Sequence, residues 1–187
     1  SGTADYTLKN SIIDGSEIST ASTASYIFGA IYNEKNTGTV FLDNVTISNC
    51  NLASANGLIT TKGNMEIKRS KIVDNYVYRD LAVAGLFFVN GAKTVTIESS
   101  IIADNSEPNQ ILSANSASAT YNLNYNNIQG NTFKNAFVYS DGTYTLDANW
   151  WGSNDKPADV AADTWVVENN GEYTLNTGDA LEKEIPG

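Results

Sequence analysis

The feature of this sequence that most constrains its fold is an eleven-residue phrase that occurs six times. Each copy has an apolar residue, a gap, Leu or Ile, two mostly polar residues, a small residue, a gap and a large apolar residue, and most copies end in Asn. The copies are Tyr6–Ser16, Val40–Cys50, Met65–Asn75, Val95–Asn105, Tyr121–Asn131 and Tyr144–Asn154. We call the third residue of each copy its anchor; the anchors are separated by 34, 25, 30, 26 and 23 residues. Recurrence at about 20 to 50 residues is typical of stacked repeat folds.

Residues within a copy alternate between apolar and polar, which is the period of a strand and not of a helix. Like residues recur in three apolar columns, which are the anchors, the residues two before them and the residues five after them. The columns are Leu8, Leu42, Ile67, Ile97, Leu123 and Leu146; Tyr6, Val40, Met65, Val95, Tyr121 and Tyr144; and Ile13, Ile47, Ile72, Ile102, Ile128 and Trp151. Parallel strands about 4.8 Å apart bring such columns into register. The pattern predicts an all-β fold, a right-handed single-stranded parallel β-helix of about six rungs with a C-terminal cap. Leucine-rich repeats fit less well because their helix-containing arc is missing.

Two polar columns accompany the apolar ones. Three residues after the anchors, where we expect the chain to turn, stand Ser11, Val45, Ser70, Ser100, Asn126 and Asn149. Eight residues after the anchors stand Ser16, Cys50, Asn75, Asn105, Asn131 and Asn154. Inward Asn side chains can pass hydrogen bonds from rung to rung, so the second column predicts a ladder. The single cysteine excludes an internal disulfide and is expected to be a buried member of this ladder.

An outward column of alternating charge follows the anchors directly. It consists of Lys9, Asp43, Lys68, Glu98, Asn124 and Asp147. Opposite charges are neighbours over the first four rungs, and each cross-strand pair contributes about 0.2–1 kcal/mol. A further apolar segment before most copies, such as Leu86–Val89, predicts a third strand in each rung. The Ser/Thr/Ala-rich segment Glu17–Ser25 is interpreted as a flexible loop.

Composition limits the possible partners and the domain organisation. The chain has 187 residues, a formal net charge of −10 and a pI near 4.3. The acidic balance argues against nucleic acid, which calls for a basic face, and disfavours anionic lipid. We find no transmembrane-length apolar run and no signal peptide. The chain opens inside a rung, so we expect it to be a piece of a longer protein. Residues 1–155 are expected to form β-helix rungs, and residues 156–187 a C-terminal cap or a linker to a following module and not another full rung.

Two segments carry a resemblance to a known family. The last copy contains Ala-Asn-Trp-Trp-Gly-Ser-Asn-Asp-Lys-Pro at 148–157, and Gly-Ala-Ile-Tyr-Asn stands at 29–33. These segments resemble the NWWG-(S/T)-N-x-x-P and GGAIYN segments of adhesin-like surface proteins of methanogenic archaea, with Phe28 in place of the first Gly. Similar rungs occur in secreted bacterial β-helices. The resemblance covers about residues 6 to 167 and implies an extracellular protein of the cell surface or cell wall that mediates attachment.

The Trp pair also has a physical interpretation of its own. Trp150 falls in a mostly outward column, and Trp151 falls in the column of the isoleucines. The last rung of a solenoid has no neighbour to cover its core, so large side chains here are expected to cap it. A platform on which a sugar stacks is the alternative.

A catalytic site is weighed because many β-helix proteins cleave polysaccharides. Such chemistry needs converging carboxylates and an acid–base residue, but the sequence has no His. The best acidic pair is Asp74 and Asp104, both seven residues after an anchor and expected about 5 Å apart on adjacent rungs. The pair could hold Ca²⁺ or share a proton; two solvated surface turns are the simpler interpretation. We therefore predict no enzyme and no required cofactor.

Two positions are candidates for recognition. Tyr76, Tyr78, Arg79 and Asp80 follow a ladder Asn and could stack on a sugar or form a protein interface; alternatively, the Tyr rings cover apolar residues of a longer turn. Asn44 begins the sequon Asn-Val-Thr and could accept a glycan outside the cell.

The sequence as a whole predicts a non-catalytic segment of a cell-surface adhesin. Its expected partner is a glycan or protein on a host or neighbouring cell, and the domain is expected to be monomeric. A polysaccharide lyase or glycoside hydrolase of the β-helix class and a purely structural stalk are the alternatives.

The inward assignment of the apolar columns can be tested at Ile72. Ile72→Asp places an unpaired charge in the core column and should lower the free energy of unfolding by several kcal/mol, about 3 or more, or abolish folding. Thermal melting followed by circular dichroism measures the loss. In the outward column, Lys68→Glu should cost about 1 kcal/mol or less. Melting of Ile72→Asp close to that of the wild type would refute the assignment.

Overall fold

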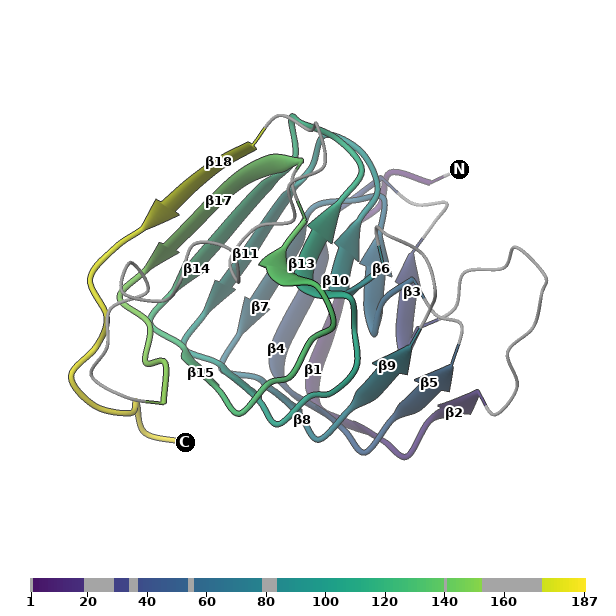
Figure 1. The fold of residues 1–187 in the computed structure, drawn as a ribbon. Coiled ribbons are helices and arrows are strands. Elements are labelled where there is room, and N and C mark those ends of the chain that lie inside the picture. The colour runs from purple at the N-terminus through teal and green to yellow at the C-terminus, as the bar shows by residue number, and fades with distance from the viewer. Residues whose placement is uncertain are drawn as a thin grey trace.

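The computed structural model describes residues 2–18, 29–33, 37–53, 56–78, 84–139, 141–152 and 173–187. Within these ranges every regular element is a strand (Figure 1). The strands are β1 (Tyr6–Asp14), β2 (Glu17–Ile18), β3 (Ile31–Asn33), β4 (Val40–Ser48), β5 (Asn51–Ala53), β6 (Ile59–Thr61), β7 (Met65–Lys68), β8 (Lys71–Val73), β9 (Tyr76–Tyr78), β10 (Gly85–Val89), β11 (Thr94–Glu98), β12 (Ile101–Ala103), β13 (Gln110–Ala114), β14 (Thr120–Asn124), β15 (Asn127–Gln129), β16 (Ala136–Val138), β17 (Gly142–Asp147) and β18 (Tyr173–Thr177).

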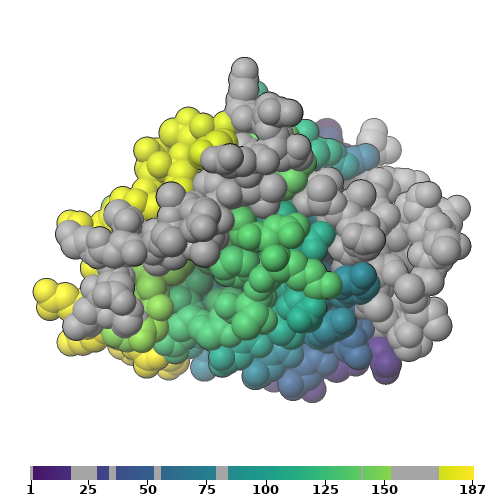
Figure 2. All heavy atoms as spheres, viewed as in Figure 1, coloured from purple at the N-terminus to yellow at the C-terminus, as the bar shows by residue number. Residues whose placement is uncertain are grey.

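The strands stack in parallel as a β-solenoid, so the predicted fold class is confirmed. The strands that carry the anchors form one wall, which we call the anchor sheet, in the order β1, β4, β7, β11, β14, β17 and β18. Behind a sharp corner, β8, β12 and β15 continue from the second half of β4 and carry the isoleucine column. A third sheet, β3–β6–β10–β13–β16, lies on the opposite side (Figure 1). Figure 2 shows the same progression as bands of colour from the N-terminal rungs to the C-terminal rungs.

The register between rungs matches the sequence columns. Each anchor pairs with the anchor of the next rung, from Leu8 with Leu42 to Leu123 with Leu146. The anchors of rungs 2 to 6 are buried, and Ile72 is fully buried in the isoleucine column. Burial of each such side chain contributes about 1.5–3 kcal/mol relative to exposure. The core is therefore a stack of like residues, as the alternation predicted.

The corner between the two walls lies one residue earlier than we expected. Residues two after the anchors, and not three after them, adopt a left-handed conformation with φ between 48° and 58°. They are Asn10, Asn44, Arg69, Ser99, Tyr125 and Ala148. Only Asn among these residue types tolerates this conformation readily. The residue after each corner consequently points inward, where its side chain is available to the neighbouring rung.

These inward residues form a hydrogen-bonded ladder that the sequence did not reveal. The backbone N–H of Val45 donates to Ser70 Oγ at 3.1 Å, and that of Ser70 donates to Ser100 Oγ at 3.1 Å. The N–H of Ser100 donates to Asn126 Oδ1 at 2.9 Å, and that of Asn126 to Asn149 Oδ1 at 3.1 Å. Each N–H at the corner is thus satisfied by a side chain of the next rung, which avoids the cost of a buried, unpaired donor.

The predicted Asn ladder is also present. Asn75 Nδ2 donates to Asn105 Oδ1, and Asn105 Nδ2 donates to Asn131 Oδ1, both at 2.9 Å. The Asn105 amide also donates to Ile72 O at 2.8 Å, so it joins three successive rungs. Cys50 is buried at the start of the ladder, and its N–H donates to Asn75 Oδ1 at 3.1 Å.

Three expectations about the rungs need correction. The strands β2, β5 and β9 of the first three rungs form an additional short sheet, which was not expected. Glu17, expected in a flexible loop, lies in β2, and residues 19–25 fall outside the described ranges. An isolated bridge from Tyr76 to Ser106 continues this sheet to the next rung. The described residues form a solenoid of about four turns, fewer than the six rungs expected.

The C-terminal end, expected to form a cap or a linker, adds one strand to the stack. β18 pairs in parallel with β17, with Leu175 beside Tyr144, and so extends the anchor sheet by one strand. Leu175 continues the apolar column of residues two before the anchors, and this match of apolar residues explains why β18 pairs with β17. The proposed boundary between residues 155 and 156 lies in 153–172, outside the described residues, as does Trp165–Val167.

Two core tyrosines stack between rungs 5 and 6. The rings of Tyr121 and Tyr144 are 5.5 Å apart and nearly parallel. The Tyr121 hydroxyl donates to Ser113 O at 2.7 Å, and the Tyr144 hydroxyl donates to Asp141 O. Burial is the main cause that raises the pKa of both phenols well above the usual value for Tyr.

Removal of one ladder amide tests the stacking. Asn105→Ala leaves the Asn75 amide, Asn131 Oδ1 and Ile72 O short of a partner, and should lower the free energy of unfolding by about 1–3 kcal/mol. The exposed Asn124, on the next rung, is the matched control, and Asn124→Ala should change the free energy by less than about 0.5 kcal/mol. Denaturant unfolding measures both variants, and equal losses would contradict the ladder.

The buried phenols predict a loss of stability at high pH. In the unfolded chain both tyrosines ionise near pH 10, whereas in the folded chain they stay protonated. Above about pH 10 the unfolded state therefore binds fewer protons, so the free energy of unfolding is complete below that pH and falls as the pH rises. Denaturant unfolding between about pH 8 and 12 should show a shallower fall for Tyr121→Phe than for the wild type. An equally steep fall in the variant would contradict the prediction.

Candidate functional site

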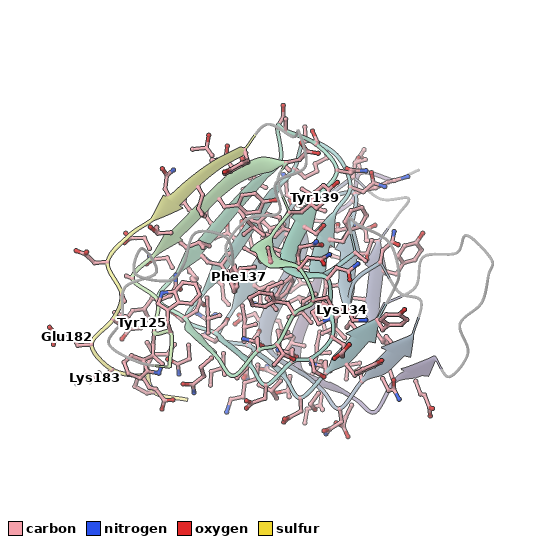
Figure 3. All side chains as sticks on the ribbon, viewed as in Figure 1. Tyr125, Lys134, Phe137, Tyr139, Glu182 and Lys183 are labelled. Carbon is pink, nitrogen blue, oxygen red and sulfur yellow. The ribbon has the colours of Figure 1, made fainter. Side chains whose placement is uncertain are left out.

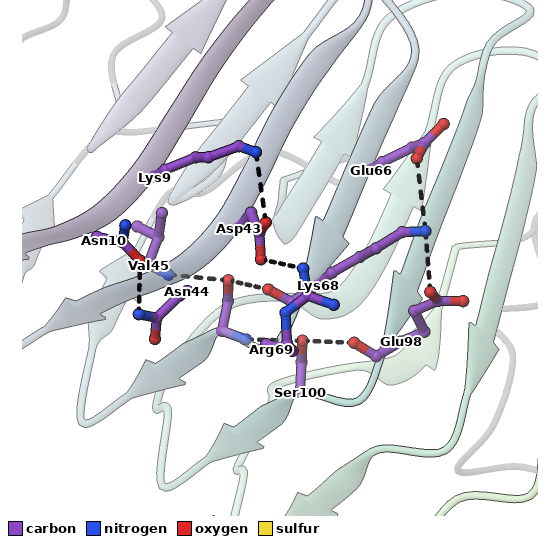
Figure 4. A network of polar contacts seen from close by, with 11 residues as sticks. Lys9, Asn10, Asp43, Asn44, Val45, Glu66, Lys68, Arg69, Glu98 and Ser100 are labelled. Atoms are coloured by element: carbon purple, nitrogen blue, oxygen red, sulfur yellow. Dashed lines mark hydrogen bonds and ion pairs between the residues drawn. The ribbon is translucent and has the colours of Figure 1, made fainter.

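The outer face of the anchor sheet is a regular surface of the described residues, and it has two parts. In rungs 1 to 4 it carries charged side chains, as the sequence predicted (Figure 4). From rung 4 onward, two further outward columns carry uncharged hydroxyl and amide side chains, while Asp147 on rung 6 continues the charged column. The second part consists of Thr94, Thr96, Thr120, Asn122, Thr143, Thr145, Thr174 and Asn176 in two aligned columns. Such hydroxyl pairs contribute to sheet stability, and these two columns offer a strip of uncharged side chains.

The charged part contains two sets of ion pairs, one around Asp43 and one around Lys68. Lys9 Nζ lies 3.8 Å from Asp43, and Lys68 Nζ lies 2.9 Å from Glu98 and 3.8 Å from Glu66. The hydrogen bond from Lys68 to Glu98 is the main cause that raises the pKa of Lys68. These groups are well exposed, so each pair contributes little to stability. Their arrangement matters chiefly as a fixed pattern of donors and acceptors.

One detail of this network differs from the expected stripe. Asp43 lies between Lys9 and Lys68 in the register, as expected, but its second ion-pair partner is Arg69 at the corner and not Lys68 (Figure 4). The left-handed corner turns the Arg69 side chain outward, where its guanidinium reaches the preceding rung. The ion pairs consequently extend around the corner and do not stay in one column.

A depression of about 300 Å³ opens in the charged part. It is lined by Thr7, Lys9, Phe41, Leu42, Asp43, Glu66 and Lys68. Phe41 is half-buried in an outward column in which Thr7 and Glu66 are its neighbours on the adjacent rungs. An aromatic face with charged donors and acceptors around it can receive an amphipathic ring. Sequence reasoning missed Phe41, although a Phe in a column of Thr, Glu and Asn is a visible signal.

The structure describes only half of the predicted aromatic recognition segment. Tyr76 lies on β9 and is partly exposed, whereas Arg79 and Asp80 lie outside the described residues. Lys134 Nζ sits 3.9 Å from the centre of the Tyr78 ring, and Lys134 also pairs with Glu107 at 3.3 Å. The face of Tyr78 is thus engaged in a cation–π contact within the protein. Of the described pair, Tyr76 is the more open to a ligand.

The predicted carboxylate pair lies on adjacent rungs as expected. Asp74 and Asp104 are both exposed and both adopt φ of 56° at a second set of corners. Asp104 faces Gly130 on the following rung, where a β-carbon would collide with its carboxylate. Among the described residues, no three His, Cys, Asp or Glu side chains gather in a way that could hold a metal ion. The site therefore offers two carboxylates to a cation.

The sequon and the Trp pair have defined surroundings. Asn44 is exposed at a corner, and its amide donates to Asn10 Oδ1 at 2.8 Å (Figure 4). Trp150 Nε1 donates to Gln129 Oε1 at 3.0 Å. The Trp151 ring packs edge-on against Phe137 at 5.5 Å, next to the core (Figure 3 labels Phe137). This contact fits the capping role of Trp151.

Within the described residues there is no helix long and apolar enough to span a membrane. Comparisons of the chain with known protein families, with curated proteins and with solved structures each found no significant match.

Proposed function

We propose that this chain is a non-catalytic segment of an extracellular adhesin that attaches to a glycan on a cell surface through the outer face of its anchor sheet. The Phe41 depression is the observation that carries the proposal. A sugar ring has an apolar face of C–H groups and a rim of hydroxyls. The Phe41 ring would take the apolar face, and Lys9, Asp43, Glu66 and Lys68 around it would pair with the rim.

The rigidity of the surface supports a binding role. The side chains around Phe41 stand on β1, β4 and β7, which are paired in register over the whole anchor strand. The ion pairs of Lys9 and Lys68 restrict these long side chains before a ligand arrives. Less conformational entropy is then lost on binding, which favours affinity.

The acidic balance of the chain and the resemblance to methanogen surface proteins support the partner class. A formal charge of −10 suits neither nucleic acid nor an anionic membrane. In this proposal the segment acts as a monomer and needs no cofactor, and Ca²⁺ at Asp74 and Asp104 is not required for attachment.

Replacement of Phe41 tests the proposal. Phe41→Ala should weaken binding by at least about tenfold, because it removes the stacking surface. A glycan array identifies a bound glycan, whole-cell binding is scored on the same protein, and titration calorimetry then compares the variants. Tyr173→Ala, at an exposed tyrosine on β18, is the control and should bind like the wild type. Unchanged binding by a folded Phe41→Ala variant would place attachment elsewhere, with Tyr76 as the next residue to replace.

Two other outcomes would replace the proposal. Release of unsaturated or reducing sugars from polysaccharides with Ca²⁺ present would show a lyase or hydrolase of the β-helix class. Absence of binding to every glycan and to whole cells would favour a structural stalk.

A further inference from the structure

A second cavity lies along the outer corner of the solenoid. A groove of about 410 Å³ follows the corners of rungs 2 to 5, past Asn44, Arg69, Ser99 and Tyr125, with Lys71 and Ile101 on its other side. It is separate from the Phe41 depression, since the two share no lining residue. Ile185, Pro186 and Gly187 also line the groove.

The C-terminal strap, residues 178–187, shows which part of the corner is occupied. The Asn127 amide holds the backbone of Ile185 with two hydrogen bonds, one from Ile185 N to Oδ1 at 2.9 Å and one from Nδ2 to Ile185 O at 3.2 Å. Ile185 is buried to all but 6%. One rung further, Gly187 lies beside Ile101. The groove also extends past Lys71 and Arg69, which line it.

The part of the groove at Arg69 and Lys71 is positively charged, although the chain as a whole is acidic. Arg69 and Lys71 line it, and no Asp or Glu does. Arg69 hydrogen-bonds to Asp43, but its side chain is 62% exposed and its guanidinium has further donors. Lys71 is exposed and makes no ion pair with the described residues. Two cations with free donors match a carboxylate.

An exposed aromatic ring lies at the other end of the groove. Tyr125 is 46% exposed and, as in Figure 3, stands beside the strap. Asn44 and Ser99 add neutral polar groups along the floor. Arg69 and Tyr125 both occupy left-handed corners, a conformation that costs free energy in such residues and that turns both side chains into this groove.

A sugar suits this groove better than a peptide. The Asn127 side-chain amide holds the strap by hydrogen bonds to its peptide backbone. In the preceding rungs, the positions aligned with Asn127 are occupied by Thr46, Lys71 and Ile101. No side-chain amide in that column is available to hold another peptide. The volume also lies within the range of small-ligand sites.

We propose that the corner groove binds the carboxylate of an acidic sugar, with Lys71 and Arg69 on the carboxylate and Tyr125 against the sugar ring. The inference rests on the proposed function only in that the ligand is a glycan. It adds the chemical class, a sialic or uronic acid, and a second contact region around the corner from Phe41.

The probes are sialyllactose against lactose, and trigalacturonate against its methyl ester. Chemical-shift changes of the backbone amides measure the affinity and the location of each sugar. At least one acidic sugar should bind at the corner about tenfold more tightly than its neutral partner. A preference for sialyllactose would identify the ligand as a sialic acid, and a preference for trigalacturonate would identify it as a uronic acid. Lys71→Met should abolish this preference, whereas Lys93→Met, at a lysine outside the groove, should leave it intact. A Glu-rich hexapeptide should bind more weakly than the acid sugar.

Equal affinity for the acid and neutral sugars would overturn the inference, and so would an unchanged preference in Lys71→Met. Preferential binding of the hexapeptide would assign the groove to a protein partner instead. If neutral glycans bind and Phe41→Ala alone weakens them, the inference fails while the proposed function stands. If no glycan binds at all, both fail.

Discussion

The structure depends on how the backbone N–H groups are satisfied where each anchor strand turns. A left-handed residue at the corner takes the chain out of one wall and into the next, and it directs the following N–H toward the interior. A buried N–H without an acceptor would cost about 1–3 kcal/mol at every rung. Ser100, Asn126 and Asn149 remove this cost, because each side chain accepts the N–H of the preceding rung. Stacking is therefore specified by polar contacts as well as by apolar burial.

This arrangement explains why the outside of the molecule is free for recognition. The inward positions are occupied by anchors, isoleucines and ladder residues, so substitutions there affect the neighbouring rungs. The outward positions lie on the same rigid sheets, but substitutions there need not affect the packing of the neighbouring rungs. Phe41 in one outward column and Tyr125 at a corner can therefore differ from their column neighbours without a change of register. Two contact regions on adjoining faces follow from this division.

The sequence predicted the columns well because each is a local pattern repeated six times. The buried anchors, the Asn75–Asn105–Asn131 ladder and the outward charges all follow from alternation and residue type. The position of the corner could not be predicted in the same way, because the turn was expected at the small residues three after the anchors, whereas the left-handed corner lies one residue earlier, at residues such as Arg69 and Tyr125. Because the corner was placed one residue too late, the members of the second ladder were interpreted as turn residues, and the ladder was not predicted.

The candidate sites were harder to predict because they depend on contacts between rungs and on residues that break the columns. Lys134 covers Tyr78 from a loop more than fifty residues away, which no local pattern indicates. The C-terminal strap returns to rung 5 through Asn127, so the corner groove is defined by segments far apart in the sequence. Phe41 was visible as an exception within its column, and such exceptions are the most useful signal of function in a repeat of this kind.

Amide hydrogen exchange tests the central claim most directly. If the corner N–H groups are held by side chains of the next rung, the amides of Val45, Ser70 and Ser100 should exchange as slowly as those of the buried anchors Leu42, Ile67 and Ile97. Exchange of these corner amides as fast as that of Ser118, in an exposed turn, would contradict the account.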